Sequence, residues 1–192
     1  WFHETGELLA PQALALDHDV GSPATVQVVP TGPDLPTQPF RDLIVGAIFQ
    51  ARRRIVVTSP YFVPDGATLL ALRLAAQGGL DVRLIMPKKS DHPLARAAAE
   101  FYCEYLMLFG VKVHLFHGGL LHAKTLVIDD EMAMFGSANY DIRSFHLNFE
   151  INLLLHGHEV VGDLARLQQR YLEQSEQMAP GVWPNPALWG RL

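Results

Sequence analysis

Short segments rich in branched apolar residues alternate with longer helical segments along most of this chain of 192 residues. The first part of the chain predicts strands at 25–29, 54–59, 82–86 and 111–116, and helices at 40–52, 68–77 and 92–109. Such alternation favours an α/β fold whose early strands are parallel. The later part predicts a hairpin at 124–128 and 132–135, a strand at 149–155 and a helix at 158–177. We therefore expect a layered, mixed but largely parallel sheet flanked by helices.

A histidine and a lysine two residues apart, His122 and Lys124, stand at the start of the expected hairpin. Side chains alternate along an extended segment, so these two point to the same side. An imidazole that can attack or transfer a proton then lies beside a fixed positive charge. This pairing suits a phosphate diester, because the ammonium holds the anionic oxygens while the imidazole acts on phosphorus or on the leaving oxygen.

Asp129 follows the same segment, but its parity differs from that of His122 and Lys124. We therefore expect a supporting carboxylate at the end of the strand, where it braces the loop or pairs with a distant base. Contact between Asp129 and a substrate is not expected from this pattern.

Several polar segments follow the ends of expected parallel strands. Tyr61 follows one strand, Lys88-Lys89-Ser90 follows another, and His117-Gly118-Gly119 follows a third. Parallel strands deliver their carboxyl ends to a common edge, where α/β folds place ligands. His122 comes directly after the last of these loops, so the expected chemistry and the expected functional edge coincide.

Composition limits the classes of protein. A hydrophobic content of 49% in 192 residues supports one globular domain with a sizeable core. The formal net charge of -5 argues mildly against a nucleic-acid binder. The single cysteine, Cys103, excludes an internal disulfide and is typical of a buried core thiol. No apolar run reaches the roughly 18 residues that span a bilayer, and no signal peptide is present.

The spacing His-x-Lys-x4-Asp from His122 to Asp129, followed by Gly-Ser-Ala-Asn-Tyr-Asp-Ile-Arg-Ser at 136–144, resembles the signature of the phospholipase D superfamily. Ser-Pro-Tyr-Phe-Val-Pro-Asp at 59–65 and Asn-Phe-Glu-Ile-Asn at 148–152 are similar to the second catalytic half of bacterial cardiolipin synthases. The similarity runs from about residue 26 to about residue 178. The combined motifs are much more specific than His-x-Lys-x4-Asp alone.

The resemblance implies roles for individual residues. It places His122, Lys124 and Asp129 in the catalytic motif, with Asn139 as an amide donor to the phosphate. Ser137 either donates to the same phosphate or closes its turn. Glu150 would hydrogen-bond the catalytic histidine or form a structural pair with Arg143. Tyr61 would line the mouth of the site or pack in the core, and Arg143 would brace the loop after the motif. Because lysines and amides carry the charge stabilisation, no metal or other cofactor is expected.

Members of this family combine two such motifs in each active site, and His122 is the one histidine of nine in this chain that has a lysine two residues later. The chain is therefore expected to carry half of a site. The partner motif would come from a missing N-terminal half or from a second identical chain. We favour the first, with 1–24 as a connector, 25–179 as the catalytic domain and 180–192 as a tail that contains proline and tryptophan.

The function that the resemblance implies is transfer of a phosphatidyl group between two phosphatidylglycerol molecules, giving cardiolipin and glycerol through a phosphohistidine. The intact protein would act at a cell inner membrane, while this part of it would be soluble and inactive alone. The partners would be phospholipid and the membrane surface, with no nucleic acid. The alternatives are a phospholipase D that uses water as acceptor, a homodimeric phosphodiesterase or nuclease, and a module that only binds phospholipid headgroups.

Overall fold

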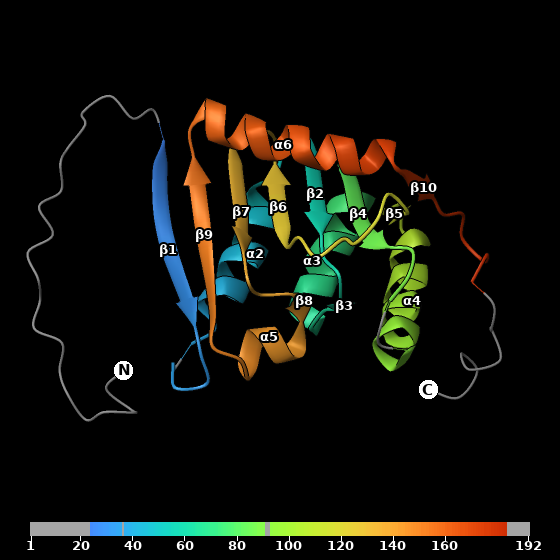
Figure 1. Ribbon diagram of the computed structural model, residues 1–192, viewed down its shortest axis with the longest axis horizontal. Helices are drawn as coiled ribbons and strands as arrows, with labels where there is room; N and C mark the ends of the chain where they lie inside the picture. The colour runs from blue at the N-terminus through green and yellow to red at the C-terminus, as the bar shows by residue number, and fades with distance from the viewer. Residues whose placement is uncertain (1–23, 36, 91–92, 184–192) are drawn as a thin grey trace, which may run out of the picture.

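The computed structural model describes residues 24–35, 37–90 and 93–183. An eight-stranded mixed sheet forms its centre, with the order β1-β9-β7-β6-β2-β4-β5-β10 (Figure 1). The strands of this sheet are β1 (Thr25–Thr31), β2 (Arg54–Thr58), β4 (Asp81–Pro87), β5 (Lys112–Phe116), β6 (Thr125–Ile128), β7 (Met132–Gly136), β9 (Glu150–His156) and β10 (Ser175–Gln177). Two short parallel strands, β3 (Phe62–Val63) and β8 (Tyr140–Asp141), form a second sheet.

The two halves of the main sheet differ in strand direction. β2, β4 and β5 are parallel, and the chain crosses between them through α3 (Gly66–Gln77) and α4 (Pro93–Met107). β6, β7, β9 and β1 are antiparallel to their neighbours. β2, β4 and β5 are parallel because a helix returns the chain between them, whereas β6 and β7 are antiparallel because the short turn 129–131 reverses the chain.

Helices cover both faces of the sheet. On one face α2 (Pro39–Gln50), α3 and α4 pack over the main hydrophobic core, which includes Ile44, Leu72 and Leu106. On the other face α6 (His158–Glu173) crosses the strands, and its Val161 packs against β6, β7 and β9 (Figure 1). Buried Gln168 fixes this helix, because its Nε2 donates to the backbone oxygen of Val56 at 3.0 Å and to Thr125 at 2.9 Å.

The observed architecture confirms the expected α/β class with a mixed sheet flanked by helices. The expectation of a largely parallel sheet was wrong, because within the described residues only the pairs β2·β4 and β4·β5 of the main sheet are parallel and its other pairs are antiparallel. Some boundaries differ. The last helix was expected to reach residue 177, but it ends at Glu173, and β10 then pairs antiparallel with β5. The strands β3 and β8 and the short helix α5 (Ile142–His146) were not predicted. Most of the expected connector and part of the expected tail lie outside the described residues. Within those residues no helix is long and apolar enough to cross a membrane.

Candidate active site

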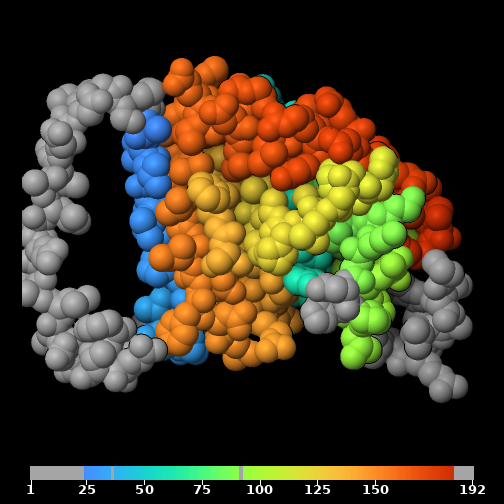
Figure 2. Space-filling model, in the orientation of Figure 1, coloured from blue at the N-terminus to red at the C-terminus, as the bar shows by residue number. Residues whose placement is uncertain are grey.

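His122 lies in the loop that leads from β5 to β6, next to the carboxyl ends of the parallel strands β2 and β4. The side chain is exposed and lines an open cavity of about 460 Å³. The rest of the cavity wall comes from the segments after β2, β4 and β5: Pro60, Tyr61, Pro87, Lys89, Ser90, Gly119, Leu120 and Leu121. Figure 2 shows the loop between β5 and β6, coloured yellow, on the surface below α6. The sheet edge that the sequence indicated therefore carries the histidine.

Lys124 is buried immediately before β6 and is only 8% exposed. Its Nζ donates a hydrogen bond to the backbone oxygen of His122 at 2.8 Å, so the ammonium is held against the loop that carries the imidazole. Burial lowers the pKa of Lys124, and the charges of Glu150 and Asp141 partly oppose this shift. The strand begins at Thr125, so His122 and Lys124 precede it instead of lying within it as expected.

Asn139 sits between β7 and β8 in a network that fixes its position. Its backbone N–H donates to Ser144 Oγ at 3.1 Å, and the N–H of Ser144 donates to Asp141 at 2.7 Å as the cap of α5. The Oδ1 of Asn139 is buried and has no hydrogen-bond partner among the described residues. With this oxygen turned inward, the amide NH2 is the end that can face the adjoining cavity, which Asn139 lines.

Glu150 is bonded to neither of the two partners expected for it. Among the described residues, its Oε1 accepts from Asn148 Nδ2 at 3.1 Å and makes a longer contact of 3.5 Å with Ser144 Oγ. The carboxylate thus belongs to the network below Asn139, and its charge favours the ammonium form of Lys124. The expected bond to His122 and the expected pair with Arg143 are both absent from this described network, because the loop after α5 supplies closer donors.

Ser137 makes two hydrogen bonds to the backbone of β9. Its Oγ accepts from the N–H of Ile151 at 2.9 Å and contacts the oxygen of the same residue at 3.3 Å. The neighbouring Gly136 is required by this close approach, because an added Cβ would lie 2.4 Å from the Ile151 oxygen. Of the two expectations for Ser137, this geometry favours closing the turn.

Tyr61 lies on the wall of two cavities. It lines the cavity of His122 and also a second cavity of about 440 Å³, which Asn139, Asp141 and Arg143 line as well. Arg143 is exposed, and its backbone oxygen accepts the N–H groups of Leu147 and Asn148. The backbone of Arg143 therefore braces the loop, while the guanidinium stands at the cavity.

Asp129 lies at the opposite end of β6 from His122. One carboxylate oxygen accepts the N–H groups of Arg53 and Arg54, each at 2.8 Å, and the other accepts that of Arg52 at 2.7 Å. Burial acts to raise the pKa of this carboxyl, but the three backbone donors and the charge of Arg53 outweigh it, so the pKa is lowered. The structure separates Asp129 from the other two residues of the motif and gives it a bracing position.

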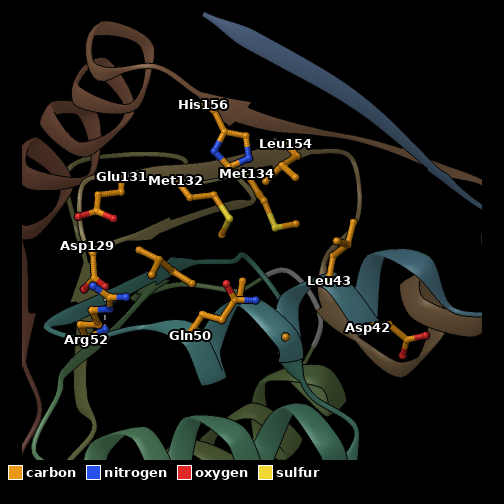
Figure 3. Close-up of a pocket in the computed structure, with 13 residues that line it drawn as sticks. Asp42, Leu43, Gln50, Arg52, Asp129, Glu131, Met132, Met134, Leu154 and His156 are labelled. Atoms are coloured by element: carbon orange, nitrogen blue, oxygen red, sulfur yellow. Dashed lines mark hydrogen bonds between the residues drawn. The ribbon is translucent and has the colours of Figure 1, made fainter.

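A further cavity of about 510 Å³ adjoins Asp129, remote from His122. Figure 3 shows its walls, with Leu43 and Gln50 projecting from α2 and Met134 and His156 projecting from the sheet. In this view the backbone of Arg52 bonds to Asp129 at the margin of the cavity. By volume this cavity would be favoured as the active site, but the motif residue that lines it, Asp129, has both carboxylate oxygens bonded to backbone N–H groups, whereas His122 and Asn139 line the other two cavities.

Two serines hold the site together and were not singled out from the sequence. Ser59 Oγ accepts the N–H of Tyr140 at 3.2 Å and bonds to the oxygen of Tyr61, so it joins the segment after β2 to β8. Ser144 links Asn139 to Asp141 as described above. The spacing Asp141-x-x-Ser144 is that of a helix N-cap, which is a signal that the sequence offered. Nothing in the sequence marks Ser59 in this way.

Comparisons with known proteins identify the class. The model of the family described as "Cardiolipin synthase, PLD-like domain" matches residues 44–172, which is more than half of the chain. The chain belongs to this family of phospholipase D-like enzymes. It is similar to the cardiolipin synthase A of Edwardsiella ictaluri, with 36% identity over 195 residues, and to that of Yersinia pseudotuberculosis serotype O:3, with 34% identity over 197 residues. Both comparisons cover the whole chain, which spans 40% of the length of these curated relatives.

Solved structures share the fold at low identity. The phospholipase D family member Nuc from Salmonella typhimurium has a TM-score of 0.68 and 20% identity, and the match covers 81% of this chain and 98% of Nuc. The phosphatidylserine synthase from Haemophilus influenzae has a TM-score of 0.66 and 16% identity, covering 81% of this chain and 40% of that one. These likenesses confirm the phospholipase D-like fold.

Proposed function

We propose that the intact protein transfers a phosphatidyl group from one phosphatidylglycerol molecule to another, which gives cardiolipin and glycerol. This chain would supply one of two half-sites. The observation that carries the proposal is the exposed imidazole of His122 in an open cavity, with the buried ammonium of Lys124 held against its backbone, in a chain of this family. An imidazole that lines an opening, with a fixed positive charge buried behind its loop, suits an anionic phosphodiester.

The first half-reaction begins when a histidine of the other half-site attacks phosphorus. The P–O bond to glycerol breaks, and His122 in its protonated form gives its proton to the departing oxygen. Lys124 and the amide of Asn139 stabilise the charge on the phosphate oxygens. In the second half-reaction the hydroxyl of another phosphatidylglycerol bonds to phosphorus, the P–N bond breaks, and His122 accepts the hydroxyl proton.

The second motif comes from elsewhere than this chain. We propose that it lies in an N-terminal half of the same polypeptide, and a second copy of the chain is the alternative source. The length of the relatives beyond the matched 40% supports the first source. The isolated chain would then be inactive, because a phosphohistidine mechanism requires a nucleophile and an acid on opposite sides of the phosphorus.

Exposed apolar residues at the site support a lipid substrate at a membrane surface, which for the intact protein we propose to be the inner membrane. Leu120, at the cavity of His122, is 93% exposed, and Leu94, at the neighbouring cavity, is 88% exposed. Exposed leucines that line these cavities can contact the acyl chains of a phospholipid.

The direct test supplies full-length protein with vesicles of phosphatidylglycerol that carries separate labels in its acyl chains and its headgroup glycerol. We expect cardiolipin and free glycerol in equal amounts. Phosphatidic acid with no cardiolipin would establish a hydrolase instead. If a dimer of the isolated chain cleaves a phosphodiester, the second motif comes from another copy of the chain. The proposal that it lies in an N-terminal half of the same polypeptide would then be wrong.

A further inference from the structure

The second cavity at Tyr61 contributes Asn139 to the mechanism above, but its other lining residues, Arg143 among them, have no role there. It measures about 440 Å³, and Tyr61 is the lining residue that it shares with the cavity of His122. Its walls come from the short strands β3 and β8, from the start of α4 and from α5. A molecule in this cavity would therefore lie beside the phosphorus centre, separated from it by one aromatic side chain.

Arg143 gives this cavity a positive charge. Its guanidinium is exposed, lines the cavity and has no ion-pair or hydrogen-bond partner within the described parts of the chain. The nearest acidic lining residue, Asp141, already accepts the N–H of Ser144 with one oxygen. An arginine that stands at a cavity without a carboxylate partner is suited to a phosphate, which its planar fork binds with two N–H groups.

The remaining lining groups suit a hydroxylated headgroup and an acyl chain. Asp141 keeps an oxygen that can accept from the headgroup hydroxyl. On the other side Val63, Leu94 and Ile142 form an apolar wall, of which Leu94 and Ile142 are exposed. A water acceptor would need neither the arginine nor the apolar wall.

We propose that this cavity binds the acceptor phospholipid, with Arg143 holding its phosphate so that its headgroup hydroxyl reaches the phosphorus past Tyr61. The inference rests on the proposed function and deepens it, because it names the residue that decides between lipid and water as acceptor. In the step concerned, the lipid hydroxyl oxygen bonds to phosphorus and the P–N bond breaks. The electron pair returns to the nucleophilic histidine, and the hydroxyl proton passes to His122.

The test compares Arg143→Gln with the wild type in the full-length protein, using doubly labelled phosphatidylglycerol vesicles. The single-turnover burst of glycerol release, which reports the first half-reaction, is expected to stay within about threefold, while the ratio of cardiolipin to phosphatidic acid falls about tenfold or more because a charge-assisted bond to the acceptor is lost. Arg143→Lys keeps the positive charge, so it should lower the ratio of cardiolipin to phosphatidic acid less than Arg143→Gln does. The matched control is Arg96→Gln on α4, whose guanidinium is paired with Glu100 at 2.8 Å and does not line the cavity.

Each outcome decides the inference. An unchanged product ratio in Arg143→Gln overturns it, and so does an equal loss of glycerol release and cardiolipin, which would make Arg143 part of the donor site or of the fold. Circular dichroism and the melting temperature separate these last two. If the wild type forms no cardiolipin, the proposed function is wrong, and the acceptor site with it. If the wild type forms cardiolipin and Arg143→Gln gives the same product ratio, only the acceptor site is wrong.

Discussion

The polar side chains at the two ends of β6 differ in exposure and in whether they have hydrogen-bond partners. At the end where β6 begins, His122 is exposed, and Arg143 is exposed and has no ion-pair or hydrogen-bond partner for its side chain among the described residues. After the strand, Asp129 is buried, and both of its carboxylate oxygens accept backbone N–H groups. Polar groups that already have partners stabilise the fold, whereas groups without partners are available to a ligand. One motif thus has the residues proposed for catalysis at one end and a carboxylate that braces the fold at the other.

The largest effect is expected from His122→Ala in the full-length protein. Removal of the group that transfers protons to and from the lipid oxygens should lower the rate of cardiolipin formation by roughly 1,000-fold. The free energy of unfolding should change little, because the side chain is exposed. His117→Ala removes another exposed histidine from the same loop and is the control. If His122→Ala forms cardiolipin at a rate close to that of His117→Ala, His122 does not take part in the reaction, and the proposed difference between the two ends of β6 is wrong.

Lys124→Met should lower the rate by roughly 100-fold, since the fixed positive charge near the phosphate is lost. Its effect on the free energy of unfolding should stay within about 1 kcal/mol, because the lost bond to the His122 oxygen is offset by removal of a buried charge. Lys112→Met removes an exposed lysine that pairs with Asp81 and serves as the control. A large loss of stability with normal activity in the folded fraction would show that Lys124, like Asp129, stabilises the fold and does not act on the phosphate.

Asp129→Ala should show the reverse pattern. Three backbone N–H groups lose their acceptor, and alanine would have to adopt the positive φ of 55° at this position, so we expect a loss of about 3 kcal/mol in the free energy of unfolding. Activity per folded molecule should remain within about threefold. Asp130→Ala carries a similar backbone cost at a φ of 63° but leaves the three N–H groups with their acceptor, so it should cost less than Asp129→Ala by about 1–2 kcal/mol. Denaturant unfolding together with activity of the folded fraction measures both.

The contribution of Asp129 should depend on pH in one direction. Because the folded state lowers the pKa of this carboxyl, its stabilisation is fully present above the unfolded value of about 4 and is lost as the pH falls through the folded pKa. The difference in unfolding free energy between the wild type and Asp129→Asn should therefore shrink below about pH 4. A constant difference from pH 7 down to pH 2 would show that the charge of Asp129 is not what matters.

The smallest effect is expected from Ser137→Ala. Loss of the bonds between its hydroxyl and Ile151 should cost about 1 kcal/mol of unfolding free energy, with the catalytic rate nearly unchanged. A rate that drops by about 100-fold with unchanged stability would instead show that Ser137 binds the phosphate. Thermal unfolding and the rate of cardiolipin formation distinguish these results.

The sequence predicted those features that depend on local pattern. Alternating segments predicted the α/β class, and the place of Asp129 at the end of the expected strand predicted a bracing carboxylate. The three polar residues of β10 carry no strand pattern, because their pairing with β5 decides their conformation. The acceptors and donors of Asp129 and Ser59 lie about eighty residues apart along the chain, so no local spacing indicates them. Glu150 was expected to bond His122 or Arg143, but the loop after α5 brings Asn148 and Ser144 to its carboxylate instead, and spacing does not indicate which residues of such a loop turn inward.

A double-mutant cycle on His122 and Lys124 tests most directly the claim that both act on one phosphorus centre. The single-turnover rate of glycerol release from labelled phosphatidylglycerol is measured for the full-length wild type, His122→Ala, Lys124→Met and the double variant. The account predicts that the double variant is slower than the slower single variant by no more than about threefold, because groups that act as a unit are not additive. A double variant whose loss equals the product of the two single losses would contradict the account, because the two residues would then act independently.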